Sequence, residues 1–227
     1  MRVAIIPARG GSKRIPRKNI KLFHGKPMIA YAIQTAHSSN LFDKIIVSTD
    51  DQEIADIACS YDAEIPFLRP KELSDDYTGT TAVVAHALEE LASKGVHPDY
   101  ACCIYATVPF LSPASLIHGY ETLVHTDSEF SFSVTTFPYP IFRALKKEED
   151  GVAMVWPEFA STRSQDLIET YHDAGQFYWG KTESWREQKK IFAPYSAPII
   201  LPRHLVQDID TPEDWIRAEF MYKALHS

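Results

Sequence analysis

A cationic loop near the amino terminus carries the clearest chemical signal in the sequence. Residues 6–19 read Ile-Pro-Ala-Arg-Gly-Gly-Ser-Lys-Arg-Ile-Pro-Arg-Lys-Asn and hold five Lys or Arg side chains. The first 42 residues contain eight Lys or Arg and no Asp or Glu, in a chain with a formal net charge of −7. Adjacent glycines allow the backbone to approach a phosphate group closely, and arginine and lysine bind its oxygens. We therefore expect the loop to hold a small anion, with a polyphosphate as the obvious candidate.

Two aspartates near the carboxyl terminus, Asp208 and Asp210, have the spacing of metal ligands. On an extended segment, i and i+2 side chains point to one side. One or two carboxylates, together with phosphate oxygens and water, are typical ligands of Mg²⁺. The other interpretation is that both acids cap the following helix, whose start is marked by Thr211, Pro212 and Asp214. The spacing alone leaves both interpretations open.

The elements that would position these residues alternate between strand and helix. Apolar runs predict strands, and apolar residues spaced at helical period predict helices between them. The expected strands are 3–6, 44–48, 63–68, 100–105, 130–136, 176–179, 198–201 and 204–207, and the expected helices are 27–37, 52–59, 81–92, 112–124 and one that follows Thr211. This alternation indicates a three-layer α/β fold with a mainly parallel sheet. Such sheets bind ligands beyond the carboxyl ends of their strands, where the cationic loop begins.

The alternation breaks after residue 136. Prolines at 138 and 140, a charged run at 146–150 and Gly151 mark an excursion, with a returning strand expected at 152–156. We interpret residues 138–172 as an arm inserted into a single domain that spans residues 1–227. Arms of this kind often serve dimerisation, so we expect a homodimer.

Composition excludes several classes of protein. An acidic chain argues against general nucleic-acid binding, which favours basic faces. The cysteines, Cys59, Cys102 and Cys103, are few and odd in number, so a disulfide framework is not expected. The first apolar run ends at Ala8, which is too short for a signal peptide or a membrane span, and we expect a cytoplasmic protein.

The cationic loop matches neither of the common phosphate-binding fingerprints. A P-loop places Lys directly after its second glycine and continues into a helix, whereas here Gly10 and Gly11 are adjacent and Pro16 interrupts. The dinucleotide pattern Gly-x-Gly-x-x-Gly is also absent from the loop. A solvated basic loop without a ligand is the alternative. The position of the loop after the first strand, in an acidic chain, argues against that alternative.

Several motifs taken together resemble the cytidylyltransferases that make CMP-activated nonulosonic acids, the CMP-sialic acid synthetases and their relatives. The resemblance covers nearly the whole chain, in the family's order and at its approximate spacing. It rests on residues 8–13 with Lys18 and Asn19, Ser48-Thr49-Asp50, Arg69-Pro70, Thr107 with Pro109, residues 175–178, and Asp208-Ile209-Asp210. Each motif alone would be a weak signal, but the set is specific. It implies a nucleotide-diphosphosugar-transferase-like, Rossmann-like fold.

The resemblance also implies a reaction and a set of site residues. CTP and a nine-carbon 2-keto sugar acid would give a CMP-sugar and pyrophosphate, with Mg²⁺ as cofactor at Asp208 and Asp210. Lys18, nearest the α-phosphate, and Arg9 are the expected catalytic residues. The expected nucleotide-binding residues are Ala8, Arg9, Gly11, Ser12, Lys13, Lys18, Asn19, Arg69, Thr80 and Thr81. The expected sugar-binding residues are Tyr105, Thr107, Arg163, Gln176 and Phe177, where Arg163 of the arm acts in its own subunit or in the partner's site.

The sugar side departs from the sialic acid members of the family. These usually carry Gln-Pro-Thr-Ser-Pro-Leu-Arg after the fourth strand, where residues 105–111 here read Tyr-Ala-Thr-Val-Pro-Phe-Leu. Residues 137–140 and 171–179 resemble instead the branch that activates pseudaminic acid. This sugar is 9-deoxy, which suits a less polar pocket, since buried polar groups left without partners change specificity strongly.

Other functions stay open at the level of sequence. Sialic, legionaminic and 3-deoxy-octulosonic acids are the other candidate sugars. A nucleotide-binding regulator without turnover is the alternative from a different class, and the intact set of Lys18, Asp208 and Asp210 argues against it. A glycosyltransferase would need an acidic metal-binding motif after the fourth strand, and Tyr105-Ala106-Thr107 contains no acid.

Overall fold

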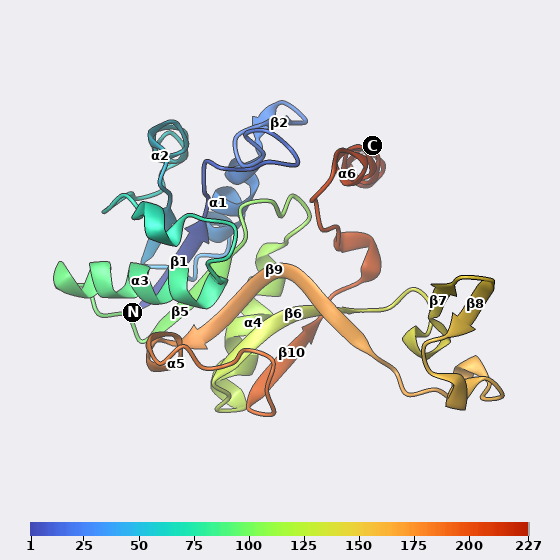
Figure 1. Ribbon diagram of the computed structural model, residues 1–227. Helices are drawn as coiled ribbons and strands as arrows, with labels where there is room; N and C mark the ends of the chain where they lie inside the picture. Colours follow the sequence, from blue (N-terminus) through green and yellow to red (C-terminus); the bar gives the residue numbers. More distant parts are fainter. Residues whose placement is uncertain (227) are drawn as a thin grey trace.

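A six-stranded sheet forms the centre of the molecule (Figure 1). The computed structural model describes residues 1–226, and the strand order is β10-β6-β9-β5-β1-β4. The strands are β1 (Arg2–Pro7), β4 (Lys44–Ser48), β5 (Tyr100–Ile104), β6 (Phe130–Thr136), β9 (Tyr171–Lys181) and β10 (Ser196–Ile200). Neighbouring strands pair in parallel except at β9, which runs antiparallel to both β5 and β6. The predicted mainly parallel sheet is confirmed.

Helices cover both faces of this sheet. On one face lie α1 (Met28–Ser38), α2 (Gln52–Cys59) and α4 (Pro113–His125), and on the other lie α3 (Thr80–Ser93) and α5 (Thr182–Arg186) (Figure 1). Alternate residues of β1 serve the two faces, because successive strand side chains point in opposite directions. Ala4 and Ile6 are buried in the core under α1, while Val3 and Ile5 are buried in the core under α3. The result is the expected three-layer arrangement.

Two of the predicted strands are wrong. Residues 63–68 pass beside β4 but form only an isolated bridge between Ile46 and Glu64. Pro66 has no N–H to donate, so a regular ladder cannot continue there. Residues 204–207 follow Pro202 and begin inside a 3₁₀ turn, Arg203–Leu205, rather than a strand. Further 3₁₀ turns lie at Lys71–Leu73, Ile141–Arg143, Pro157–Phe159 and Ser164–Asp166.

A third apolar cluster joins the cationic loop to the carboxyl-terminal segment. Ile15 of the loop, Ile209 and Trp215 of helix α6 (Pro212–Leu225) are buried around Phe23. Phe23 belongs to a two-stranded ribbon of β2 (Leu22–Phe23) and β3 (Lys26–Pro27). Burial of Ile209 turns the two flanking side chains, both aspartates, away from this cluster. Apolar packing thus holds two segments together that are almost the full chain apart in sequence.

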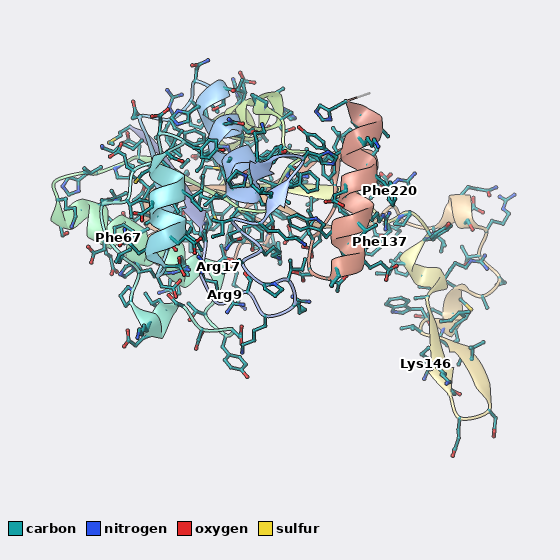
Figure 2. All side chains as sticks on the ribbon, turned by 90° about the horizontal axis from the view of Figure 1, so that it is seen from above. Arg9, Arg17, Phe67, Phe137, Lys146 and Phe220 are labelled. Carbon is teal, nitrogen blue, oxygen red and sulfur yellow. The ribbon has the colours of Figure 1, made fainter. Side chains whose placement is uncertain are left out.

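The segment between β6 and β9 forms an arm that projects from the sheet (Figure 1). It carries the hairpin β7 (Leu145–Glu148) and β8 (Gly151–Met154), and Lys146 lies out on this hairpin (Figure 2). Phe142 packs on Trp156 and Phe159, with ring centroids 5.7 and 4.7 Å apart. The arm ends slightly earlier than predicted, because β9 already begins at residue 171. Within residues 1–226, every helix is too short or too polar to cross a membrane.

Gly119 marks the point at which α4 meets β9. A Cβ added there would lie 2.6 Å from Cε2 of Phe177 and 2.9 Å from Cδ1 of Trp179, and both rings are fully buried. We expect Gly119→Ala to lower the free energy of unfolding by about 1–3 kcal/mol through overpacking, in spite of the higher helix propensity of alanine. Urea denaturation measures this. Gly11→Ala, where nothing lies within 4 Å of the added Cβ, is the matched control for stability. Equal stabilities of the two variants would contradict the tight contact.

Candidate active site

A cavity of about 350 Å³ opens beyond the carboxyl ends of β1 and β5. Its walls come from the cationic loop, from the segment that leads into α3, from the residues that follow β5, and from the segment before α6. Ten of the site residues predicted from sequence line it: Arg9, Ser12, Lys13, Lys18, Asn19, Arg69, Thr80, Tyr105, Thr107 and Asp210. The fold therefore gathers most of the predicted site into one place.

Some predicted residues have other surroundings. The Phe177 side chain is fully buried beneath α4, so it cannot contact a sugar, and the predicted sugar-binding role is replaced by packing. Gln176 is also buried, and its Nε2 donates to the carbonyl of Leu205 at 2.5 Å, which ties β9 to the segment before Asp208. Arg163 lies on the arm, paired with Asp166 at 2.8 Å.

Four other predicted site residues do not line the cavity. They lie close in sequence to residues that do. Ala8 is fully buried behind the start of the loop. Gly11 and Thr81 adjoin Ser12 and Thr80 in sequence. Asp208 lies two residues before Asp210 on the extended segment before α6.

Hydrogen bonds hold the cationic loop in a closed shape. Asn19 is buried, and its Nδ2 donates to the carbonyl of Arg9 at 3.0 Å, joining the two ends of the loop. The amide of Gly10 donates to Oδ1 of Asp50 at 3.0 Å. A Cβ at Gly10 would lie only 2.6 Å from Oδ2 of Asp51. The glycine is thus needed for contact with the start of α2, and not only for the approach of a ligand as the sequence suggested.

Carboxylates from outside the loop pair with its cations. Asp76, from the segment before α3, lies 2.6 Å from Nη1 of Arg9 and 2.5 Å from Nζ of Lys13. Both cations lower the pKa of Asp76 by hydrogen bonding, with Lys13 contributing most. Sequence reasoning missed this acid, which lies 63 residues from Lys13 along the chain, so local spacing gave no signal for it.

Asp210 makes the second set of ion pairs. Its carboxylate lies 2.7 Å from Nη2 of Arg14 and 3.2 Å from Nζ of Lys18. Lys18 Nζ also donates to the carbonyl of Ile209 at 2.6 Å, and only 18% of the Lys18 side chain is exposed. Arg14 lines the cavity and was not among the predicted site residues, although it lies within the cationic run.

The helix-capping interpretation of the two aspartates does not hold. Thr211 accepts from the amide of Asp214, and the Asp214 carboxylate accepts from the amide of Thr211, a capping box that satisfies the start of α6. The carboxylates of Asp208 and Asp210 are therefore not used as caps. Desolvation and the neighbouring charge of Asp210 raise the pKa of Asp208. A cation bound there would favour the charged carboxylate and so oppose the rise in pKa.

Arg69 is a buried cation with unsatisfied donors. The residue is 5% exposed and lines the cavity, and its Nε and Nη2 have no hydrogen-bond partner within residues 1–226. The nearest carboxylate oxygen, Oδ1 of Asp50, is 4.0 Å from Nη2. Desolvation lowers the pKa of the guanidinium. A buried unsatisfied donor costs about 1–3 kcal/mol, so Arg69 is held in the cavity wall at some cost in stability.

The part of the cavity wall that follows β5 carries one aromatic residue, Tyr105. The hydroxyl groups of Tyr105 and Thr80 are hydrogen-bonded at 2.9 Å, and burial raises the pKa of Tyr105. The Tyr105 ring lies 5.3 Å from that of Tyr178, whose hydroxyl donates to Asp173 at 2.5 Å. The Tyr105 hydroxyl, which lines the cavity, is thus engaged within the protein.

Comparison with known proteins agrees with this geometry. A family model described as cytidylyltransferase matches residues 3–219. The pseudaminic acid cytidylyltransferase of Campylobacter jejuni is 48% identical over 225 residues, covering 99% of this chain and 97% of that protein. The CMP-N,N'-diacetyllegionaminic acid synthase of Legionella pneumophila is 33% identical over 221 residues, covering 96% and 94%. A solved CMP:2-keto-3-deoxy-manno-octonic acid synthetase, complexed with CTP, matches with a TM-score of 0.71 at 14% identity over 99% of both chains, which confirms the expected fold.

Proposed function

The chain belongs to the cytidylyltransferase family of nucleotidyltransferases, and on that premise we propose that it transfers CMP from CTP to a nonulosonic acid. The first candidate for the sugar is pseudaminic acid, so that the products are CMP-pseudaminic acid and pyrophosphate. The observation that carries this proposal is the cavity that the loop cations Arg9, Lys13 and Lys18 line together with Arg69. The 48% identity to a pseudaminic acid enzyme over nearly the whole chain supports the choice of sugar.

The loop is proposed to bind the triphosphate. Arg9 and Lys13 supply positive charge, which Asp76 neutralises in the unliganded protein, and Ser12 adds a hydroxyl group. Arginine binds phosphate oxygens through two parallel hydrogen bonds, and lysine acts as a point charge. Arg69, which lines the same cavity, is proposed to add positive charge to the nucleotide site.

Lys18 is proposed to act at the reacting phosphate. In the transfer, the anomeric oxygen of the sugar forms a bond to the α-phosphorus, and the bond from that phosphorus to the bridging oxygen of pyrophosphate breaks. Negative charge grows on the phosphate oxygens as this happens, and a fixed cation in a largely desolvated position stabilises it. Lys18 provides such a cation, since its side chain is mostly buried and points to the segment with Asp210.

Asp208 and Asp210 are proposed to hold Mg²⁺. Their oxygens are the ligand type that Mg²⁺ prefers, and the raised pKa of Asp208 indicates a position that favours a cation. Within residues 1–226 no group of three or more His, Cys, Asp or Glu could hold a metal, so phosphate oxygens and water would complete its coordination. When bound, the ion supplies positive charge to the phosphate oxygens.

The sugar is proposed to bind near Tyr105 and Thr107, which line the cavity on the side of β5. Because the Tyr105 hydroxyl is already bonded to Thr80, this residue suits a sugar that lacks a hydroxyl group at its end. Arg163 lies outside this cavity, on an arm that projects from the sheet, and we propose that it reaches the site of the partner in a homodimer (Figure 1).

Pyrophosphate release tests this function. The protein is incubated with Mg²⁺, each of the four nucleoside triphosphates and a panel of nonulosonic acids, and CMP-sugar formation is measured in parallel. We expect turnover with CTP and the highest kcat/KM with pseudaminic acid. A preference for sialic or legionaminic acid would overturn the choice of sugar. No release with any sugar would favour a nucleotide-binding regulator.

Asp76 is expected to compete with the triphosphate. It occupies two of the loop cations in the unliganded protein, and a nucleotide must displace it to reach them. Exposed ion pairs are weak, so we expect Asp76→Asn to lower the Kd for CTP by only about two- to fivefold. Calorimetry at constant ionic strength measures the change. Asp127→Asn, which breaks a surface pair with Lys181, is the control and should leave Kd unchanged. A weaker affinity in Asp76→Asn would show that this acid assists binding.

A further inference from the structure

Arg17 stands next to Lys18 but does not line the cavity. Its guanidinium binds Asp51 through two parallel hydrogen bonds, Nη1 to Oδ2 at 2.5 Å and Nη2 to Oδ1 at 3.0 Å. Nη2 also donates to Glu53 at 2.6 Å. Figure 2 shows Arg17 beside α2. This cation of the loop is therefore directed to the start of α2, unlike Lys18, which is directed to Asp210.

The backbone of Arg17 has an unfavourable conformation. Its φ is +55°, in the left-handed region that residues other than glycine rarely adopt. Its carbonyl accepts from the amides of Ile20 at 3.0 Å and Lys21 at 2.9 Å, which makes a tight turn directly at Lys18. A conformation of this kind persists only where surrounding contacts hold it. The ion pair with Asp51 is the contact that the Arg17 side chain itself provides.

Asp51 is fixed independently of the loop. It is the N-cap of α2, where its Oδ1 accepts from the amide of Ile54 at 3.0 Å, and its own amide donates to Thr49. Its carboxylate also fills the space left by the absent side chain of Gly10. Hydrogen bonding from Arg17 lowers the pKa of Asp51, so the carboxylate is charged at neutral pH. One rigid carboxylate thus contacts the loop near its start, at Gly10, and near its end, at Arg17.

We propose that the Arg17–Asp51 pair positions Lys18 by clamping the loop turn to the start of α2. Arg17 and Asp51 are positioning residues in this proposal, since neither lines the cavity. The proposal rests on the function proposed above only in the role it gives to Lys18. The competing idea is that Arg17 leaves Asp51 and binds the triphosphate directly.

Asp51→Asn separates these two ideas. Asparagine caps a helix as well as aspartate does, so α2 keeps its N-cap. The bidentate ion pair between the Arg17 guanidinium and the carboxylate is lost. If the pair positions Lys18, kcat with CTP should fall about tenfold to 100-fold, as expected for a displaced catalytic group, while KM for CTP changes less than threefold. If Arg17 binds phosphate, the variant releases Arg17, KM falls and kcat is kept, which would overturn the proposal.

A double-mutant cycle tests whether the two residues act as a unit. We expect Arg17→Ala to lower kcat as Asp51→Asn does, and the double variant to lose no more than either single variant. Additive losses would overturn the proposal. Glu64→Gln, which removes another short ion pair of similar length, with Lys44, is the matched control and should keep the wild-type kcat.

Amide hydrogen exchange without ligand gives a readout that needs no turnover. The amides of Lys18, Ile20 and Lys21, all hydrogen-bonded within the turn, should exchange faster in Asp51→Asn, while the amides of α2 stay protected. Unchanged exchange would overturn the clamp whatever the activity, and faster exchange with a wild-type kcat would overturn the positioning of Lys18. A wild-type protein that releases no pyrophosphate from CTP would count against the proposed function alone.

Discussion

Lys18→Met is expected to lower kcat for pyrophosphate release from CTP by about 10²–10³-fold, the loss found when one preorganised charge-stabilising group is removed from an active site. The Lys18 ammonium group lies 2.6 Å from the carbonyl of Ile209 and 3.2 Å from Asp210. Methionine keeps most of the length and apolar surface of lysine and removes the charge. The loss should therefore fall on the transition state more than on packing.

The separate effects of Lys18→Met on kcat and on KM show whether Lys18 contacts the substrate in the ground state or in the transition state. A fall in kcat with an unchanged KM for CTP indicates a contact made in the transition state, and a rise in KM alone indicates a contact made equally in the ground state. Lys21→Met is the matched control: this lysine belongs to the same chain segment, but its Nζ lies over the ring of Trp215 at 4.3 Å. We expect the control to keep the wild-type kcat. A Lys18→Met variant with wild-type kcat would remove Lys18 from the mechanism.

Local features of the fold were predictable because they depend on near neighbours in sequence. Strands such as β4 and β6, and helix α2, have the predicted bounds because periodicity and caps act within a few residues. The strand predicted at 63–68 was wrong because Pro66 leaves only one bridge to β4. The strand character of residues 176–179 was correct, but the antiparallel insertion of β9 between β5 and β6 depends on where the arm returns the chain.

The candidate site was likewise predictable only in its local features. The cations of the loop were visible as a cluster, because five of them lie within 14 residues. Their partners, Asp76 and Asp51, come from other segments, and nothing in local spacing connects an acid to a cation that far along the chain. The aromatic residues of β9 illustrate a different limit. Phe177 and Tyr178 are neighbours of similar type, yet one packs under α4 and the other beside Tyr105, and only the register of β9 in the sheet decides which.

Asp208→Asn is expected to abolish Mg²⁺-dependent turnover, with a loss of about 10²–10³-fold, since the charge that a metal gives to phosphate oxygens contributes several kcal/mol. Stability should not fall. A carboxyl group whose pKa is raised on folding destabilises the folded protein above its unfolded pKa, and neutral asparagine removes that cost at pH 7. The melting temperature without Mg²⁺ should therefore stay constant or rise. Mg²⁺ should also no longer tighten CTP binding in this variant.

Asp214→Asn gives the opposite pattern and serves as the control. Its carboxylate accepts from the amides of Asp210 and Thr211 and belongs to the capping box of α6, so this variant should lose about 0.5–2 kcal/mol of stability and keep its response to Mg²⁺. The two variants thus separate a metal ligand from a helix cap on the same short segment. If Asp208→Asn were instead to melt earlier and turn over CTP at the wild-type rate, the carboxylate of Asp208 would be a structural group and the metal would have to bind elsewhere.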